Sequence, residues 1–162
     1  MASSATFKRE QTTLALLIYG AMVDNTSLLE VSPQQNRKYM NNTDKEQWFW
    51  NIIANAKEDR ELLRTILMEF SKDNIVAFQE IFVDLAAELQ CEPFTNYIEE
   101  SEDGVEDVSH WVVSKGRTYY EKILKHPELI PYSIKGNDSD TILYGIADEV
   151  CLDKYNDVTG IY

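Results

Sequence analysis

The chain has 162 residues, of which 28 are acidic and 15 basic, so its formal net charge at pH 7 is −13. A chain of this length fits one domain with a substantial buried core. The negative charge argues against nucleic acid and anionic membrane surfaces as partners, because both carry phosphate groups that repel such a chain.

The first 39 residues are predicted to form an extension that packs on a helical domain over residues 40–162. Apolar side chains fill most of residues 14–23, which predicts a buried helix over residues 7–24. Ten apolar residues are too few to span a bilayer. The Asn, Ser and Pro content of residues 25–43 is typical of a loop.

Residues 43–70 predict two helices. The pattern Thr43-Asp-Lys-Glu46 is typical of a capping box, in which a hydroxyl and a later Glu satisfy free N–H groups at a helix start. We predict a first helix from Thr43 to about Lys57. Leucines and isoleucines recur at helical spacing in the next segment, which predicts a second helix from Glu58 to Phe70.

Three consecutive aromatic residues, Trp48, Phe49 and Trp50, lie in the first of these helices. Consecutive helical residues point about 100° apart, so the three side chains do not all enter one core. One interpretation leaves Trp48 exposed as a contact for a partner, since Trp is enriched at interface hot spots. The other packs the outer ring beneath the loop over residues 25–42.

Asp73 is a suitable N-cap for a third helix, whose apolar stripe runs from Ile75 to Leu89 and ends before Pro93. The segment over residues 94–100 fits either a short helix or an extended link. The two cysteines, Cys91 and Cys151, are too few for a small secreted domain, and we expect free thiols. A disulfide between them stays open, because the sequence does not supply the distance.

Ser101 can cap the next helix, which we expect to continue to Ile123 unless Gly116 breaks it. A last helix is predicted from Ser139 to a point before Gly160. No run with clean alternation of apolar and polar residues predicts a strand. We therefore predict an all-α fold, a single-domain bundle of about six helices.

Negative charge is concentrated in one stretch of the chain. Between Lys72 and Lys115 there are eleven carboxylates and no Lys or Arg, so this stretch contributes −11 to the net charge. Six of the carboxylates flank the start of the helix that Ser101 caps, and we call them the acidic segment: Glu99, Glu100, Glu102, Asp103, Glu106 and Asp107. Such a field attracts a basic protein. The alternative is that the acids are spread over several helices and only solvated.

No catalytic or metal motif of comparable clarity is present. Residues 99–104 resemble the first half of a calcium loop, but position 12 is His110 where the loop needs Glu. The second histidine, His126, is too distant along the chain to form a zinc motif with it. We expect no metal ion, no organic cofactor and no enzymatic activity, and we interpret His110 as a helix-surface residue.

Several blocks of sequence carry a family resemblance. Residues 49–56 begin Phe-Trp and continue with Ile and Ala at set intervals, and residues 74–82 place Phe78 and Phe82 four apart. A longer series over residues 101–129 includes Ser-Glu-Asp, Trp-Val-Val-Ser-Lys-Gly, Tyr-Glu and Pro-Glu-Leu. In order and spacing these blocks resemble the domain of unknown function 4240 family over roughly residues 40–160.

The resemblance implies a small, mainly helical, cytoplasmic domain, and it implies no established activity. The chain departs from the family pattern at two places. Residues 98–100 replace the Gly-Gly-Cys that many members show, and residues 108–110 replace a Phe-Arg. A role of the family's arginine therefore cannot be transferred to this chain.

The concentrated charge and the absence of a catalytic set favour a protein-binding function. We expect an immunity-type antidote that blocks a basic toxin or effector protein through the acidic segment and Trp48, without nucleic acid or membrane contacts. The alternative is a regulatory or sensor domain that binds a cation or a small ligand in a helical pocket near residues 101–107 and His110. The oligomeric state stays open.

Overall fold

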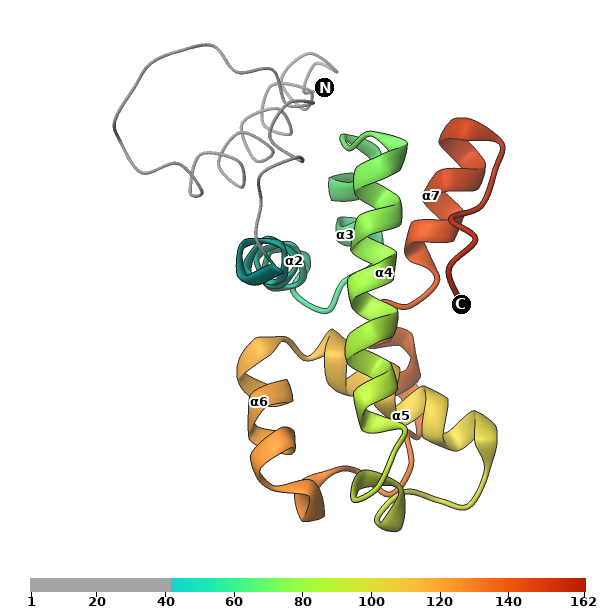
Figure 1. The fold of residues 1–162 in the computed structure, drawn as a ribbon. Coiled ribbons are helices and arrows are strands. Elements are labelled where there is room, and N and C mark those ends of the chain that lie inside the picture. The colour runs from blue at the N-terminus through green and yellow to red at the C-terminus, as the bar shows by residue number, and fades with distance from the viewer. Residues whose placement is uncertain (1–41) are drawn as a thin grey trace, which may run out of the picture. The chain divides into compact units, whose positions relative to one another are not determined.

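The computed structural model describes residues 42–162 (Figure 1). Contacts divide the chain between Asn51 and Ile52, and the two parts are described separately. The predicted helix over residues 7–24 and the predicted boundary between residues 39 and 40 lie outside the described residues.

Every regular element in the described part of the chain is a helix. The α-helices are α2 (Asn42–Ala56), α3 (Arg60–Met68), α4 (Lys72–Leu89), α5 (Glu102–Ser114), α6 (Arg117–Lys125) and α7 (Ile146–Tyr155). The 3-10 helices are η2 (Phe94–Asn96), η3 (Pro127–Leu129) and η4 (Gly136–Thr141). The predicted all-α class is confirmed. Five helices were predicted for this part of the chain, and a sixth appears because one of them divides.

The helix α2 begins one residue before the predicted capping box, so Thr43 lies inside the helix and is not its N-cap. Glu46 accepts a hydrogen bond from Trp50 Nε1 at 3.0 Å, one turn further along. The side chain that was predicted to close the box therefore bonds to the indole.

Two residues between α2 and α3 have positive φ, Lys57 at 52° and Glu58 at 60°. Neither is glycine, so each is in a sparsely populated backbone conformation. The helix α3 starts after this turn, because Asp59 is its N-cap and accepts a hydrogen bond from Leu62 N at 3.0 Å. The predicted start at Glu58 was two residues early.

The longest described helix is α4, and within residues 52–162 it packs against both α5 and α7 (Figure 1). Its buried stripe includes Ile75, Phe78, Phe82 and Leu89, as the spacing predicted. The N-cap is Ser71 and not Asp73, since the Ser71 hydroxyl accepts a hydrogen bond from Asn74 N. Asp73 lies in the first turn instead, where the helix dipole favours a negative charge.

The helix predicted over residues 101–123 divides at Gly116, where φ is 89°. A residue with a side chain would be strained in that conformation, so glycine allows the chain to turn between α5 and α6. The helix α6 then reaches α4, because Tyr120 Oη donates to Leu85 O at 3.0 Å and to Glu88 Oε2 at 2.8 Å.

The last helix is shorter than predicted. Ser139 lies in η4, where its hydroxyl donates to Gly136 O, and α7 begins only after Gly145, at φ 86°. Ser114 explains why residues just before Gly145 do not continue the helix. Its buried hydroxyl accepts a hydrogen bond from Leu143 N at 2.8 Å, which ties this loop to α5.

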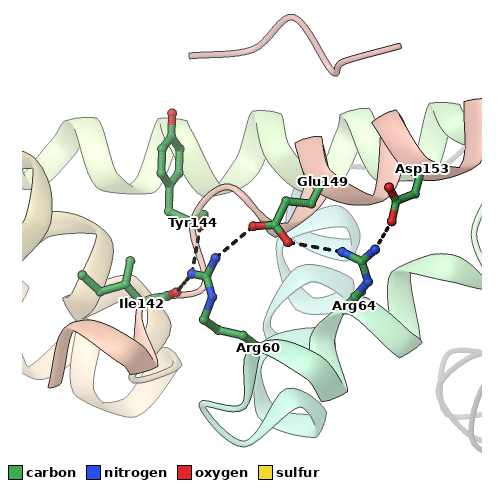
Figure 2. Close-up of polar contacts among 6 residues, drawn as sticks. All are labelled: Arg60, Arg64, Ile142, Tyr144, Glu149 and Asp153. Carbon is green, nitrogen blue, oxygen red and sulfur yellow. Dashed lines mark hydrogen bonds and ion pairs between the residues drawn. The ribbon is translucent and has the colours of Figure 1, made fainter. Parts of the chain in front are cut away.

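Ion pairs and hydrogen bonds join α3 to α7 and to the loop before it (Figure 2). Arg60 pairs with Glu149 at 3.1 Å and donates to the carbonyl oxygens of Ile142 and Tyr144. Arg64 pairs with Glu149 at 3.2 Å and with Asp153. The carboxylates are half exposed, so we expect about 0.2–1 kcal/mol from each pair. Arg60 also satisfies two carbonyl groups, which anchors the loop.

The two cysteines are free thiols. Cys91 is exposed and Cys151 is buried, and burial raises the pKa of the Cys151 thiol. None of the helices described over residues 42–162 combines the length and the apolar character that a membrane span requires.

Candidate functional site

The acidic segment lies at the N-terminal end of α5 and in the loop before it. Ser101 is the N-cap of α5, as predicted, and its hydroxyl accepts a hydrogen bond from Gly104 N at 3.1 Å. Five of the six carboxylate residues are exposed, and Glu99 is half-buried. The four acids on α5 lie within about 140° of the helix circumference, because successive residues are about 100° apart. They therefore share one side of the helix.

The Glu99 side chain lies against Gly104. The Glu99 side chain folds over the first turn of α5, where a Cβ on Gly104 would collide with Glu99 Oε1 and with Ser101 Oγ. A carboxylate in this position faces the positive end of the helix dipole. Glu102 and Asp103 occupy the same first turn, so three negative charges gather around one helix start.

No described Lys, Arg or His forms an ion pair with the acidic segment. The nearest lysine and arginine along the chain, Lys115 and Arg117, pair with Glu58 and Glu121 instead. The carboxylates of the segment therefore have no counter-ion among the side chains of residues 42–162. A field of this kind extends about 10 Å into solvent at ordinary salt concentrations.

Exposed aromatic and apolar side chains lie on the chain just before the acidic segment and on the segment after α6. Tyr132 is 66% exposed, Leu129 46% and Tyr97 44%, and we call these three residues the tyrosine patch. Glu99 N donates to Tyr132 O at 2.9 Å, so the chain after η3 lies beside the loop that carries Glu99. The patch was not predicted from the sequence, because tyrosines in irregular segments follow no periodic pattern.

His110 is part of an aromatic cluster and not a free surface residue. Its ring stacks on Tyr144, with 3.8 Å between centroids and 5° between planes, and Phe82 of α4 lies 6.0 Å from it. Burial lowers the pKa of His110 from 6.5 to about 4. Burial raises the pKa of Tyr144, with smaller contributions from Asp148 and other acids. The interpretation of His110 as a surface residue was wrong, because Tyr144 covers it from a distant part of the chain.

The three consecutive aromatics of α2 are all buried: Trp48 is 8% exposed, Trp50 3% and Phe49 0%. The expectation that Trp48 is exposed for a partner contact is therefore not met. The burial of all three rings agrees with the other interpretation, in which none of them is exposed. Trp48 offers a partner almost no surface.

The calcium-loop pattern does not form a loop. Residues from Glu102 onward are helical, so Asp103 and Gly104 belong to the first turn of α5. Within residues 42–162 no group of three His, Cys, Asp or Glu side chains is placed to hold a metal ion. What this surface offers is negative charge beside exposed tyrosines, which suits recognition of a cationic partner.

The comparisons with known proteins give one finding. The model of a family described as "Protein of unknown function (DUF4240)" matches residues 44–152, which run from the first turn of α2 into α7. No curated protein and no solved structure matches the chain. The matched residues include the whole acidic segment and all of α3 to α6, and the chain belongs to the DUF4240 family.

Proposed function

We propose that this protein binds a basic protein partner through the acidic segment. The observation that supports the proposal is the set of six carboxylates around the start of α5, which have no counter-ion among residues 42–162. Like charges this close repel one another and lower the stability of the fold. A cationic partner would remove that repulsion, so binding and relief of repulsion act together.

The charge arrangement favours fast association. Concentrated charge of one sign can raise the rate of encounter with an oppositely charged partner by about 10–1000-fold, and salt weakens the effect. A toxin that acts on nucleic acid needs a basic cleft to attract phosphate groups. In its specific form, the proposal is therefore that this protein is an immunity-type antidote that blocks such a basic toxin or effector.

The first experiment captures the partner. The full chain is immobilised, and a lysate of the source cells is passed over it at low salt and then at high salt. We expect a basic protein to be retained at low salt and released at high salt. Production of that protein alone should arrest growth of a host cell, and production of this chain with it should restore growth.

The matched variants decide whether the acidic segment makes the contact. The acidic-segment triple variant carries Glu102→Lys, Asp103→Lys and Glu106→Lys, and it should no longer retain the partner. Circular dichroism checks that the helices remain. Retention that is equal to that of the wild type would contradict the proposal.

A control triple variant separates local charge from net charge. It carries Glu61→Lys, Glu69→Lys and Glu80→Lys, all exposed residues on or beside α3 and α4. Its net charge changes by the same amount as that of the acidic-segment triple variant, and Glu61 is also a first-turn acid. We expect this variant to retain the partner at low salt.

The alternative function, a sensor of a cation or small ligand near residues 101–107, has its own test. Thermal unfolding is measured with calcium, magnesium and manganese at micromolar concentrations. Specific binding to the folded state would raise the unfolding temperature. Under the proposed function, the three ions have equal and small effects.

A further inference from the structure

We infer that the partner contacts this protein with arginine side chains that lie on the rings of Tyr97 and Tyr132 and pair with the carboxylates of Glu99 and Glu100. The inference rests on the proposed function, because it names the chemistry of the partner at that same surface. It adds a short-range contact to the long-range attraction between charges.

The two tyrosines and the two carboxylates lie on adjoining pieces of chain. Tyr97 precedes Glu99 by two residues, and Tyr132 O accepts the hydrogen bond from Glu99 N at 2.9 Å. Both tyrosines are exposed, Tyr132 at 66% and Tyr97 at 44%. Within residues 42–162 neither ring stacks on another ring or lies beneath a lysine, whereas Trp111 and Tyr155 each have a lysine above them. The ring faces of the tyrosine patch are therefore available to a cation from outside.

Arginine fits this surface better than lysine does. The face of a phenol ring attracts a cation, and the flat guanidinium group can stack on it. The guanidinium keeps its N–H groups at its edge, where they can bond to a carboxylate through two parallel hydrogen bonds. A lysine ammonium is a compact and strongly hydrated charge, so it makes either contact less well.

The acids decide which kind of partner covers the tyrosine patch. A nucleic acid would bring phosphate groups against Glu99 and Glu100 and would be repelled. An apolar protein surface would remove water from these carboxylates without giving them a partner, which is costly. An arginine-bearing protein surface satisfies the carboxylates and covers the aromatic rings together.

Two peptides of equal charge test the inference with the full chain. Fluorescein-labelled nona-arginine and nona-lysine are titrated with the protein, and the dissociation constants are read from fluorescence anisotropy. We expect nona-arginine to bind about three- to tenfold more tightly than nona-lysine, from one or two exposed cation–π contacts. Equal affinities would overturn the inference.

Variants locate the contact. The double variant Tyr97→Leu with Tyr132→Leu keeps apolar side chains but removes both aromatic rings, and it should bring the affinity for nona-arginine down to that for nona-lysine. The control is Tyr155→Leu on α7, because Lys154 already lies 5.4 Å above that ring, and it should bind both peptides like the wild type. Thermal unfolding shows that each variant is folded.

The outcomes distinguish the inference from the proposed function. If the tyrosine double variant still prefers nona-arginine, while the acidic-segment triple variant binds neither peptide, the inference is wrong and the proposed function stands. If the acidic-segment triple variant binds both peptides as well as the control triple variant does, charge at α5 attracts no cation. That result would overturn the inference and the proposed function together.

Discussion

Lowering the pH should reduce the free energy of unfolding of this protein, because His110 is packed against other rings. An exposed histidine should have a smaller effect. The imidazole stacks on Tyr144 and faces Phe82, and burial lowers its pKa from 6.5 to about 4. The unfolded chain therefore binds a proton at a pH where the folded protein does not. The contribution of the neutral His110 ring to the free energy of unfolding is complete above pH 6.5, and it is lost as the pH falls from 6.5 towards 4.

The size of the loss follows from the two pKa values. Each unit of difference between the folded and unfolded pKa corresponds to about 1.4 kcal/mol. A fall from pH 7 to pH 5 covers about 1.5 pH units below the pKa of the unfolded chain. We expect the free energy of unfolding to fall by about 2 kcal/mol over this range because of His110 alone.

Urea unfolding at pH 7 and at pH 5, followed by circular dichroism, measures this loss. His110→Phe keeps a flat ring against Tyr144 and does not titrate, so it should lose about 2 kcal/mol less than the wild type between the two pH values. The control His126→Gln changes the exposed histidine and leaves the burial of His110 as it is, so it should lose as much as the wild type. Equal losses in the wild type and in His110→Phe would refute the reasoning.

Three further predictions follow from local structure. Lys57→Gly should be up to about 1 kcal/mol more stable than Lys57→Ala in urea unfolding, because both remove the charge and only glycine relieves the positive φ; equal stabilities would show that the turn is unstrained. Ser101→Ala should cost about 1 kcal/mol through the lost N-cap, and Ser139→Ala, which is no cap of an α-helix, should cost less in the same assay. In titration with a thiol reagent, Cys91 should react in the folded protein and Cys151 only after unfolding, and two fast thiols would contradict the burial.

The sequence predicted those features that depend on a few neighbouring residues. The Ser101 cap and the apolar stripe of α4 both appear in the structure, because capping and helical spacing are local properties. The start of α2 at Asn42 was missed by one residue, and the N-cap of α4 at Ser71 was missed by two. Several residues near each start could have capped the helix, and the sequence does not rank them.

Two glycines show where local patterns stop being sufficient. The apolar spacing continues across both Gly116 and Gly145, so it favoured longer helices than the structure has. The chain turns at these positions because distant contacts select the turned conformation. Leu143 N, for example, bonds to the buried hydroxyl of Ser114, and no pattern around Gly145 reveals that bond.

In the candidate site, too, some features were predictable from the sequence and others were not. The exposed carboxylates of the acidic segment follow from composition alone. The hydrogen bond from Glu99 N to Tyr132 O joins the two segments that carry the tyrosine patch, and the ring of Tyr144 stacks on His110. Both are contacts between remote parts of the chain, so the sequence analysis had no signal for them.

The most direct test of the central claim is the affinity of the captured partner for three proteins at one low salt concentration. These are the wild type, the acidic-segment triple variant and the control triple variant, each measured by isothermal titration calorimetry. The account predicts that the wild type and the control variant bind with similar affinity, and that the acidic-segment variant binds at least tenfold more weakly, since several close charge pairs are reversed. Equal weakening of the two variants would contradict it, because net charge alone, and not the surface at α5, would then attract the partner.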